Sequence, residues 1–327
     1  MADSKEIGRW LIANSKHLNL KVAKASWVKD WIPKHKHVRV EVNINGVTGI
    51  GTGIDISEDL ALVKAGSEAI ERVFCIQNSK HSTGIAAHVE IERAKENAML
   101  ELMERDIFLS HYLTREPFII ENEIQAANIE YGQIRKKLQS LGVDFDVLKM
   151  KTEKSYYGYV CFASPSAQPA SFSSIIGLGF SKDQNIAIEK SIAECLLNTI
   201  FHLHNKDTVP SLSLDEFNSK LKHGPTEHRE LFLSSSCQNE IKKLISTTTD
   251  EQVFDDSHFH FEFQELLSDS EILLDSPFKV YQATSSDVQN MFYGPTNIST
   301  LNIIRLEHFK KEKINVEDLN MLPHCLG

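Results

Sequence analysis

The sequence predicts an α/β protein that folds as one domain. Segments with the alternation of strands and segments with the periodicity of helices follow one another along the 327 residues. No linker or change of composition separates them, so we expect one domain over residues 1–327, whose first 37 residues show the least regular pattern. A motif that recurs on the predicted helices supports the same class.

The first half of the chain begins with a predicted hairpin. Apolar residues alternate over residues 38–44, and the pair Asn45-Gly46, a strong signal of a tight turn, leads into a second strand from Val47. Periodic apolar positions then predict helices over residues 60–76 and 90–113.

The second half continues the alternation of strands and helices. Its last long predicted helix follows the glycine pair Gly177 and Gly179. The predicted elements are helices over residues 124–141 and 185–202, strands over 145–149, 157–162, 278–283 and 300–306, and loops over 234–236 and 247–249.

The chain is acidic and shows no pattern of a secreted or membrane protein. Lys and Arg number 35 against 45 Asp and Glu, which gives a net charge of −10. Such a surface disfavours general binding to nucleic acid or anionic membranes, because both carry phosphate. No run approaches the ~20 apolar residues of a membrane span, and the five scattered cysteines form no disulfide or zinc pattern. We therefore expect a cytoplasmic protein that binds neither nucleic acid nor membrane.

An internal repeat is the most informative feature of the sequence. Three segments share a glycine, a later alanine and, seven residues after the alanine, a glutamate. The first two continue identically as Glu-x-x-Glu-Arg, and at this spacing the charged residues share one helix face. The three sets are Gly53, Ala61 and Glu68; Gly84, Ala94 and Glu101; and Gly179, Ala187 and Glu194.

The Glu-x-x-Glu-Arg motifs are candidates for a cation site. Their apolar neighbours predict partial burial, and buried carboxylates are costly unless a cation pairs with them. Ordinary Glu–Arg ion pairs on a helix surface are the alternative, but two copies with one spacing favour a shared function. Clustered glutamates can bind Mg²⁺, which neutralises nucleotide phosphates. The motif residues are Glu68, Glu71 and Arg72 on the first helix, and Glu101, Glu104 and Arg105 on the second.

At these residues the sequence resembles the YcaO family, from about Val42 to the end. Four ordered blocks carry the resemblance, which implies a YcaO-like α/β domain of mixed sheets with repeated motif-bearing helices. The blocks are residues 51–53 leading to 68–72, 82–86 leading to 101–106, 177–179 leading to Ala187 and Glu194, and 322–324.

The resemblance implies an ATP- and Mg²⁺-dependent enzyme that activates a backbone amide of a peptide. The amide oxygen is phosphorylated and a nucleophile replaces it, which yields azolines, thioamides or amidines in ribosomally made peptides. The implied partners are a precursor peptide and an E1-like or TfuA-type protein that binds its leader, in a homo- or hetero-oligomer. By position, the implied Mg²⁺ ligands are Glu68, Glu71, Glu101 and Glu104, and the implied phosphate contacts are Glu68, Glu71, Arg72 and Arg105.

Four positions depart from the family pattern. Ala65 stands where the family usually has serine, and Leu197 where it usually has glutamine. Val89 and Arg93 stand where it usually offers asparagine and glutamate. These departures leave open an alternative of a different class, a catalytically silent YcaO homologue that scaffolds a biosynthetic complex or binds a substrate peptide. Nucleotide binding would distinguish the two.

Three other clusters have simpler explanations than a functional site. His258, His260 and Glu262 share one face of a predicted strand, and a polar outer face explains them better than a zinc site without further ligands. Cys75 and Cys195 lack a catalytic signature and are expected to be inert thiols. An N-terminal group could hold a peptide or nucleotide but is more simply a helical surface with core aromatics: Trp10, Trp27, Trp31, Lys21, Lys24 and Lys29.

Overall fold

The computed structural model describes residues 2–121, 123–152, 155–166, 172–204, 212–234, 247–248 and 259–326. The chain divides into two compact units, each of which contains helices and sheets. Unit 1 comprises Met1–Leu102 and His260–Ser285, and unit 2 comprises Met103–Phe259 and Ser286–Gly327. The mixed α/β class is therefore confirmed, whereas one domain over residues 1–327 stays a prediction. Within the described residues, no helix combines the length and the apolar character needed to cross a membrane.

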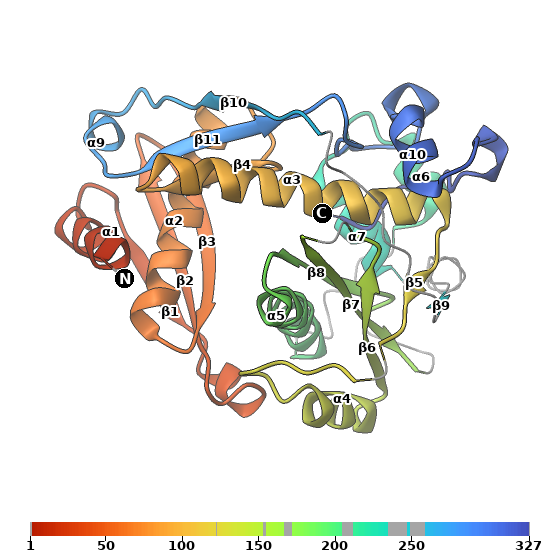
Figure 1. Ribbon diagram of the computed structural model, residues 1–327. Helices are drawn as coiled ribbons and strands as arrows, with labels where there is room; N and C mark the ends of the chain where they lie inside the picture. Colours follow the sequence, from red (N-terminus) through yellow and green to blue (C-terminus); the bar gives the residue numbers. More distant parts are fainter. Residues whose placement is uncertain are drawn as a thin grey trace. The chain divides into compact units, whose positions relative to one another are not determined.

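Unit 1 contains two three-stranded antiparallel sheets, in the orders β1-β2-β3 and β10-β11-β4. In the second sheet, β11 from the later part of the chain pairs with β4 from the earlier part (Figure 1). The elements of unit 1 are α1 (Ala2–Ala13), β1 (Lys21–Lys24), the 3-10 helix η1 (Ser26–Asp30), β2 (Lys36–Ile44), β3 (Val47–Asp55), α2 (Glu58–Gln77), β4 (Ile85–His88), the first part of α3 (Ile91–Thr114), β10 (Glu262–Glu265), α9 (Glu271–Leu274) and β11 (Lys279–Thr284).

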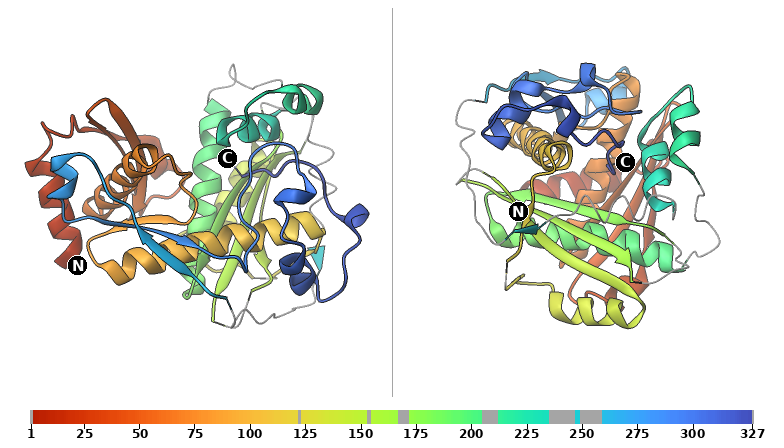
Figure 2. Two further views of the ribbon diagram at one scale, coloured as in Figure 1. Left: turned by 90° about the horizontal axis from the view of Figure 1, so that it is seen from above. Right: turned by 90° about the vertical axis from the view of Figure 1, so that its right-hand side faces the viewer.

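The hairpin of β2 and β3 forms as the sequence predicts. Ile44 lies opposite Val47, and between them Asn45 and Gly46 have φ values of 53° and 83°. Both are left-handed, as a type I′ turn requires. Helix α2 covers one face of this hairpin (Figure 2). The core between them includes Val38, Val40, Val42, Ala61, Ala65, Ala69 and Val73.

Glycines of β3 let α2 approach the sheet closely. A Cβ atom added at Gly53 would lie 1.9 Å from the carbonyl oxygen of Ala61, and one at Gly51 would lie 2.1 Å from that of Ala65. These distances are far below van der Waals contact, so a side chain at either position would push the helix away. The close approach also brings Glu68 of α2 beside the strand.

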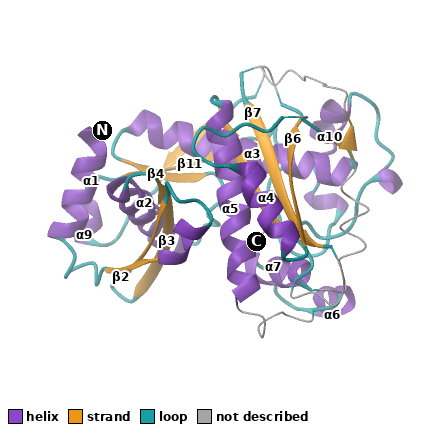
Figure 3. Cartoon of the chain, turned by 90° about the horizontal axis from the view of Figure 1, so that it is seen from below, coloured by secondary structure: helices purple, strands orange, loops and turns teal. Residues whose placement is uncertain are grey.

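Unit 2 is built on a five-stranded sheet of order β8-β7-β6-β5-β9, in which only β9 is parallel to its neighbour. Helix α5 packs against β8 and against β7, beside which it lies in Figure 3. The elements of unit 2 are the second part of α3, β5 (Phe118–Ile119), α4 (Tyr131–Ser140), β6 (Val143–Met150), β7 (Tyr157–Pro165), β8 (Ile175–Ser181), α5 (Gln184–His204), α6 (Leu214–Ser219), α7 (Pro225–Leu233), β9 (Thr247–Thr248), η4 (Ile298–Thr300), α10 (Ile303–Lys310) and η5 (Val316–Asp318).

Most predicted elements are confirmed with small changes at their ends. The helices predicted over residues 60–76, 90–113 and 185–202 are α2, α3 and α5, and the strands over 145–149, 157–162 and 278–283 are β6, β7 and β11.

The strand predicted over residues 300–306 is wrong, because this segment contains the end of η4 and the start of α10. Its β-branched isoleucines favour a strand. However, the side chain of Asn302 accepts the backbone N–H of Arg305, which starts a helix.

Two further predictions need correction. The helix predicted over residues 124–141 is only α4, because the Glu189 carboxylate accepts the backbone N–H of Asn128 at 2.8 Å and holds the preceding segment in a non-helical path. Residues 247–248, predicted as a loop, form β9, and Thr248 accepts the backbone N–H of Ile120. Residues 235–236 and 249 lie outside the described residues.

Candidate functional site

The first candidate glutamate, Glu68, is fixed at two points in unit 1. Its Oε2 accepts the backbone N–H of Thr52 in β3 at 2.7 Å, and its Oε1 forms an ion pair with Arg72 at 3.3 Å. The side chain stays partly exposed, at 34%. The i, i+4 spacing on α2 thus places an arginine on the carboxylate, as the sequence predicts.

Glu71 of α2 and Glu101 of α3 are neighbouring carboxylates of unit 1. Burial, and after it the Glu101 carboxylate, raises the pKa of Glu71 well above its ordinary value, and Arg72 offsets this only in part. The backbone of Ala87 also donates a hydrogen bond to Glu71. Two carboxylates that repel each other in this way would be stabilised by a cation, so they are the strongest sign of a cation site in unit 1.

Glu104, the next glutamate of α3, belongs to unit 2 and is paired with a lysine. Its side chain is 1% exposed, and its Oε2 accepts the Lys190 ammonium at 2.7 Å. Its Oε1 lies 3.9 Å from Nη2 of Arg105. Partial burial acts to lower the pKa of Lys190, but Glu104 raises it above its ordinary value. The carboxylate therefore already has a cation from its own chain.

Glu194 of α5 lies in the same charged cluster of unit 2. Its Oε2 accepts the backbone N–H of Leu178 in β8 at 2.9 Å. Burial raises the pKa of Glu194, Arg105 acts to lower it, and Glu104 acts to raise it. The cluster thus contains two carboxylates and, with Lys190, two cations.

The internal repeat has a structural basis in two of its three copies. In both, a strand amide donates to the glutamate sixteen residues later, Thr52 to Glu68 and Leu178 to Glu194. The glycine after each amide packs against a helix alanine, and a Cβ atom there would lie 1.9 Å from the alanine carbonyl oxygen. The second copy differs, because Gly84 has a φ of +70° and pairs with β11. It shares only the helix motif.

Comparison with known proteins identifies the family. A family model described as "YcaO cyclodehydratase, ATP-ad Mg2+-binding" matches residues 74–268, more than half of the chain. The chain belongs to the YcaO family. The matched residues include parts of unit 1 and of unit 2. A search of curated proteins finds no match.

Solved structures share the YcaO fold at low sequence identity. A heterocyclase in complex with substrate and cofactor has a TM-score of 0.63 at 11% identity, covering 98% of this chain and 57% of its own. YcaO from Methanopyrus kandleri, bound with AMPPCP and Mg²⁺, has a TM-score of 0.55 at 14% identity, and the match covers 88% of this chain and 91% of that one. A chain of the E. coli microcin synthetase McbBCD complex has a TM-score of 0.60 at 12% identity, and the match covers 93% of this chain and 96% of that one. The chain thus spans little more than half the length of the heterocyclase.

Two of the departures from the family pattern, Ala65 and Arg93, have contacts that show what each side chain does in this YcaO protein. Ala65 is fully buried, and a Cβ at Gly51 would meet its carbonyl oxygen. Arg93 forms an exposed ion pair with Glu90 at 3.0 Å. Glu92, also near the altered positions, is 85% exposed and pairs with Lys95. Both glutamates therefore pair with a cation at an exposed position.

The acidic side chains fit a divalent ion in unit 1 better than in unit 2. Among the described residues, no three His, Cys, Asp or Glu side chains are close enough to hold a metal by themselves. Mg²⁺ commonly takes one or two carboxylates and completes its shell with water and phosphate oxygens. Glu71 and Glu101 offer such hard oxygen ligands, whereas the Glu104 carboxylate is occupied by Lys190.

The other predicted clusters do not form sites in the described part of the chain. His258 lies outside it, and His260 precedes β10, whose residues are all exposed. Cys75 and Cys195 are buried free thiols, and burial raises the pKa of Cys75 to about 12.

The N-terminal basic–aromatic group is engaged in packing and ion pairs. Trp10 contacts the ring of Phe278 edge to face. Lys21 and Lys24 form ion pairs with glutamates of unit 1. These contacts agree with the structural explanation of the group.

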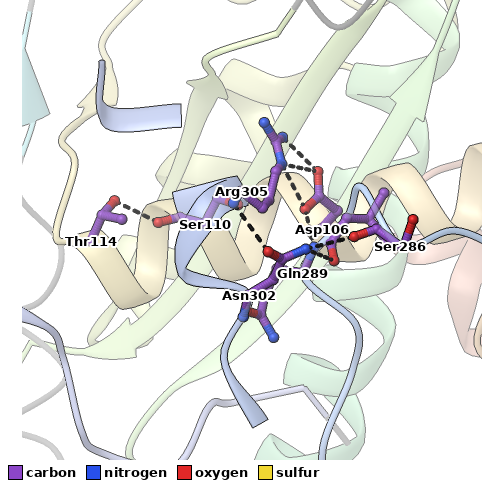
Figure 4. A network of polar contacts seen from close by, with 8 residues as sticks. Asp106, Ser110, Thr114, Ser286, Gln289, Asn302 and Arg305 are labelled. Carbon is purple, nitrogen blue, oxygen red and sulfur yellow. Dashed lines mark hydrogen bonds and ion pairs between the residues drawn. The ribbon is translucent and has the colours of Figure 1, made fainter. Parts of the chain in front are cut away.

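Sequence reasoning missed the polar network on the second half of α3. The Asp106 carboxylate accepts the Arg305 guanidinium at 2.6 Å and the backbone N–H of Gln289 at 2.7 Å (Figure 4). Asp106 and Arg305 are 199 residues apart, so no spacing could have joined them. Lys190 was also missed, although it lies four residues before Glu194, at the spacing of a helix ion pair.

Proposed function

We propose that this YcaO protein uses ATP and Mg²⁺ to activate a backbone amide of a precursor peptide. The observation that supports the proposal most is the repulsion between Glu71 and Glu101, in a chain of a family whose model is described as binding Mg²⁺. When bound, ATP supplies the phosphoryl group that makes the amide oxygen a leaving group. A nucleophile then completes an azoline, thioamide or amidine.

The residues of unit 1 have distinct roles in this proposal. Glu71 and Glu101 hold Mg²⁺ and so lose their mutual repulsion. Glu68, held by Thr52 and Arg72, adds negative charge beside them. Arg72 contacts phosphate, because a guanidinium matches the geometry of phosphate oxygens. Arg105 stays a predicted phosphate contact, as the resemblance to the family implies.

Partner proteins are part of the proposal. The similar E. coli microcin synthetase McbBCD is a complex of several subunits, and one of its structures has pro-MccB17 bound. By this likeness we propose that the chain acts in the cytoplasm on a precursor peptide, with an E1-like or TfuA-type protein that binds the leader.

A silent scaffold is the second candidate function. It is favoured by Leu197 and Arg93, which replace residues usual in the family, and by the exposed position of Arg93 in its ion pair with Glu90. A scaffold of this kind would bind the peptide or its partner but not ATP.

Calorimetric titration with ATP and Mg²⁺ tests the proposal. We expect magnesium-dependent ATP binding that Glu101→Gln weakens about tenfold or more, since one metal ligand loses its charge. Glu92→Gln is the matched control, because Glu92 lies on the same helix but is 85% exposed. Absence of ATP binding, with and without a partner protein, would reject the enzyme in favour of the scaffold.

A further inference from the structure

The two acidic clusters have different charge balances. In unit 1, the carboxylates of Glu68, Glu71 and Glu101 all act on the guanidinium of Arg72. When ionised, these four side chains together carry two more negative charges than positive ones.

In unit 2, the carboxylates of Glu104 and Glu194 face Lys190 and Arg105. When ionised, these four side chains balance in charge. A divalent cation would balance the four side chains of unit 1, whereas it would add two positive charges to the four of unit 2.

Lys190 supplies one of the two positive charges among these four side chains of unit 2. Its ammonium lies 2.7 Å from Oε2 of a carboxylate that is 1% exposed. A buried carboxylate needs a cation close by, because its loss of hydration is otherwise uncompensated. The side chain of Lys190 itself is 49% exposed, so it carries its charge to Glu104 without being fully removed from water.

We propose that Lys190 is the resident cation of Glu104 and takes the place of a metal ion in unit 2. Any divalent ion that this chain binds is then held by the carboxylates of unit 1, and Glu104 is not a metal ligand. The part concerning metal in unit 1 rests on the proposed function, whereas the assignment of Lys190 to Glu104 does not.

Titration with Mn²⁺ alone tests this assignment, with free Mn²⁺ followed by electron paramagnetic resonance. Lys190→Met removes the ammonium and keeps most of the apolar stem. We expect this variant to bind one more equivalent of Mn²⁺ than the unchanged chain. We expect the gain to disappear in the double variant Lys190→Met with Glu104→Gln, and Lys190→Arg to show no gain.

Thermal unfolding gives a second readout if the single variant is unstable. Lys190→Met should unfold at a lower temperature than the unchanged chain, because Glu104 then lacks a cation. Added Mn²⁺ should restore its unfolding temperature, but not that of the double variant. Glu104→Gln alone should leave Mn²⁺ binding unchanged.

Two results would overturn the inference. One is loss of Mn²⁺ binding in Glu104→Gln, which would make Glu104 a metal ligand. The other is a Lys190→Met variant that neither gains a Mn²⁺ equivalent nor is stabilised by Mn²⁺. Neither result depends on ATP binding or on peptide modification, so failure of the inference is distinguishable from failure of the proposed function.

Discussion

At the residue scale, the buried pair of Asp106 and Arg305 links the second half of the motif-bearing helix α3 to α10. The two side chains are 0% and 1% exposed (Figure 4). We predict that Asp106→Asn destabilises the protein by about 3–5 kcal/mol, because it removes the carboxylate charge that faces the buried Arg305 guanidinium. Urea unfolding would measure the loss. Asp146→Asn is the control, since the side chains of Asp146 and its ion-pair partner Arg135 are 46% and 45% exposed, and equal effects of the two substitutions would contradict the prediction.

At the scale of elements, the contact between β3 and α2 depends on glycine. Alanine at Gly53 would bring Cβ to 1.9 Å from a backbone oxygen of α2, whereas nothing lies within 4 Å of a Cβ at Gly132 in α4. We predict that Gly53→Ala destabilises by about 3 kcal/mol, since the backbone of α2 must move. Gly132→Ala should stabilise by about 0.5–1 kcal/mol. Chemical denaturation of both variants checks the contrast, and a tolerated Gly53→Ala would refute the close packing.

At the scale of the molecule, stability should fall on mild acidification because of three buried histidines. In His111, His228 and His324, one ring nitrogen donates to a backbone carbonyl and the other accepts a backbone N–H, so each is neutral. Burial lowers the pKa of His111 and His324 to about 3 and lowers that of His228. The ionisable groups beside them are Lys151 and Arg305 for His111, His223 and Glu227 for His228, and His228 and Arg105 for His324.

The sign of this effect follows from the depressed folded-state pKa values. The unfolded chain takes up protons below pH 6.5 while the folded chain does not, so stability is lost as the pH falls from 6.5 towards about 3. His111 and His324 each contribute a loss of about 1.4 kcal/mol per pH unit in this window. Urea unfolding midpoints between pH 7 and about pH 5.5 measure how steeply stability falls with pH. His324→Gln should make this fall less steep, whereas His17→Gln, at an exposed position, should not. An equally steep fall in both variants would show that His324 does not cause the loss of stability.

Local signals explain how much of the fold the sequence predicts. The turn at Asn45-Gly46 and the long periodic helices are confirmed, because neighbouring residues specify them. The strand predicted over residues 300–306 failed where a single cap, Asn302, outweighed β-branched neighbours. The helix predicted before Tyr131 failed because a contact from Glu189, far along the chain, held that segment.

By itself, the sequence determined the α/β class, the resemblance to the YcaO family and the helices that bear the acidic motifs, since these depend on spacing along the chain. The roles predicted for Glu68, Glu71, Glu101 and Glu104 remain predictions. Only the tertiary structure decided which carboxylates have a cation of their own. The partner of Glu104 comes from another helix, 86 residues away. Charge interactions depend on distance through space, and spacing in the sequence does not give that distance.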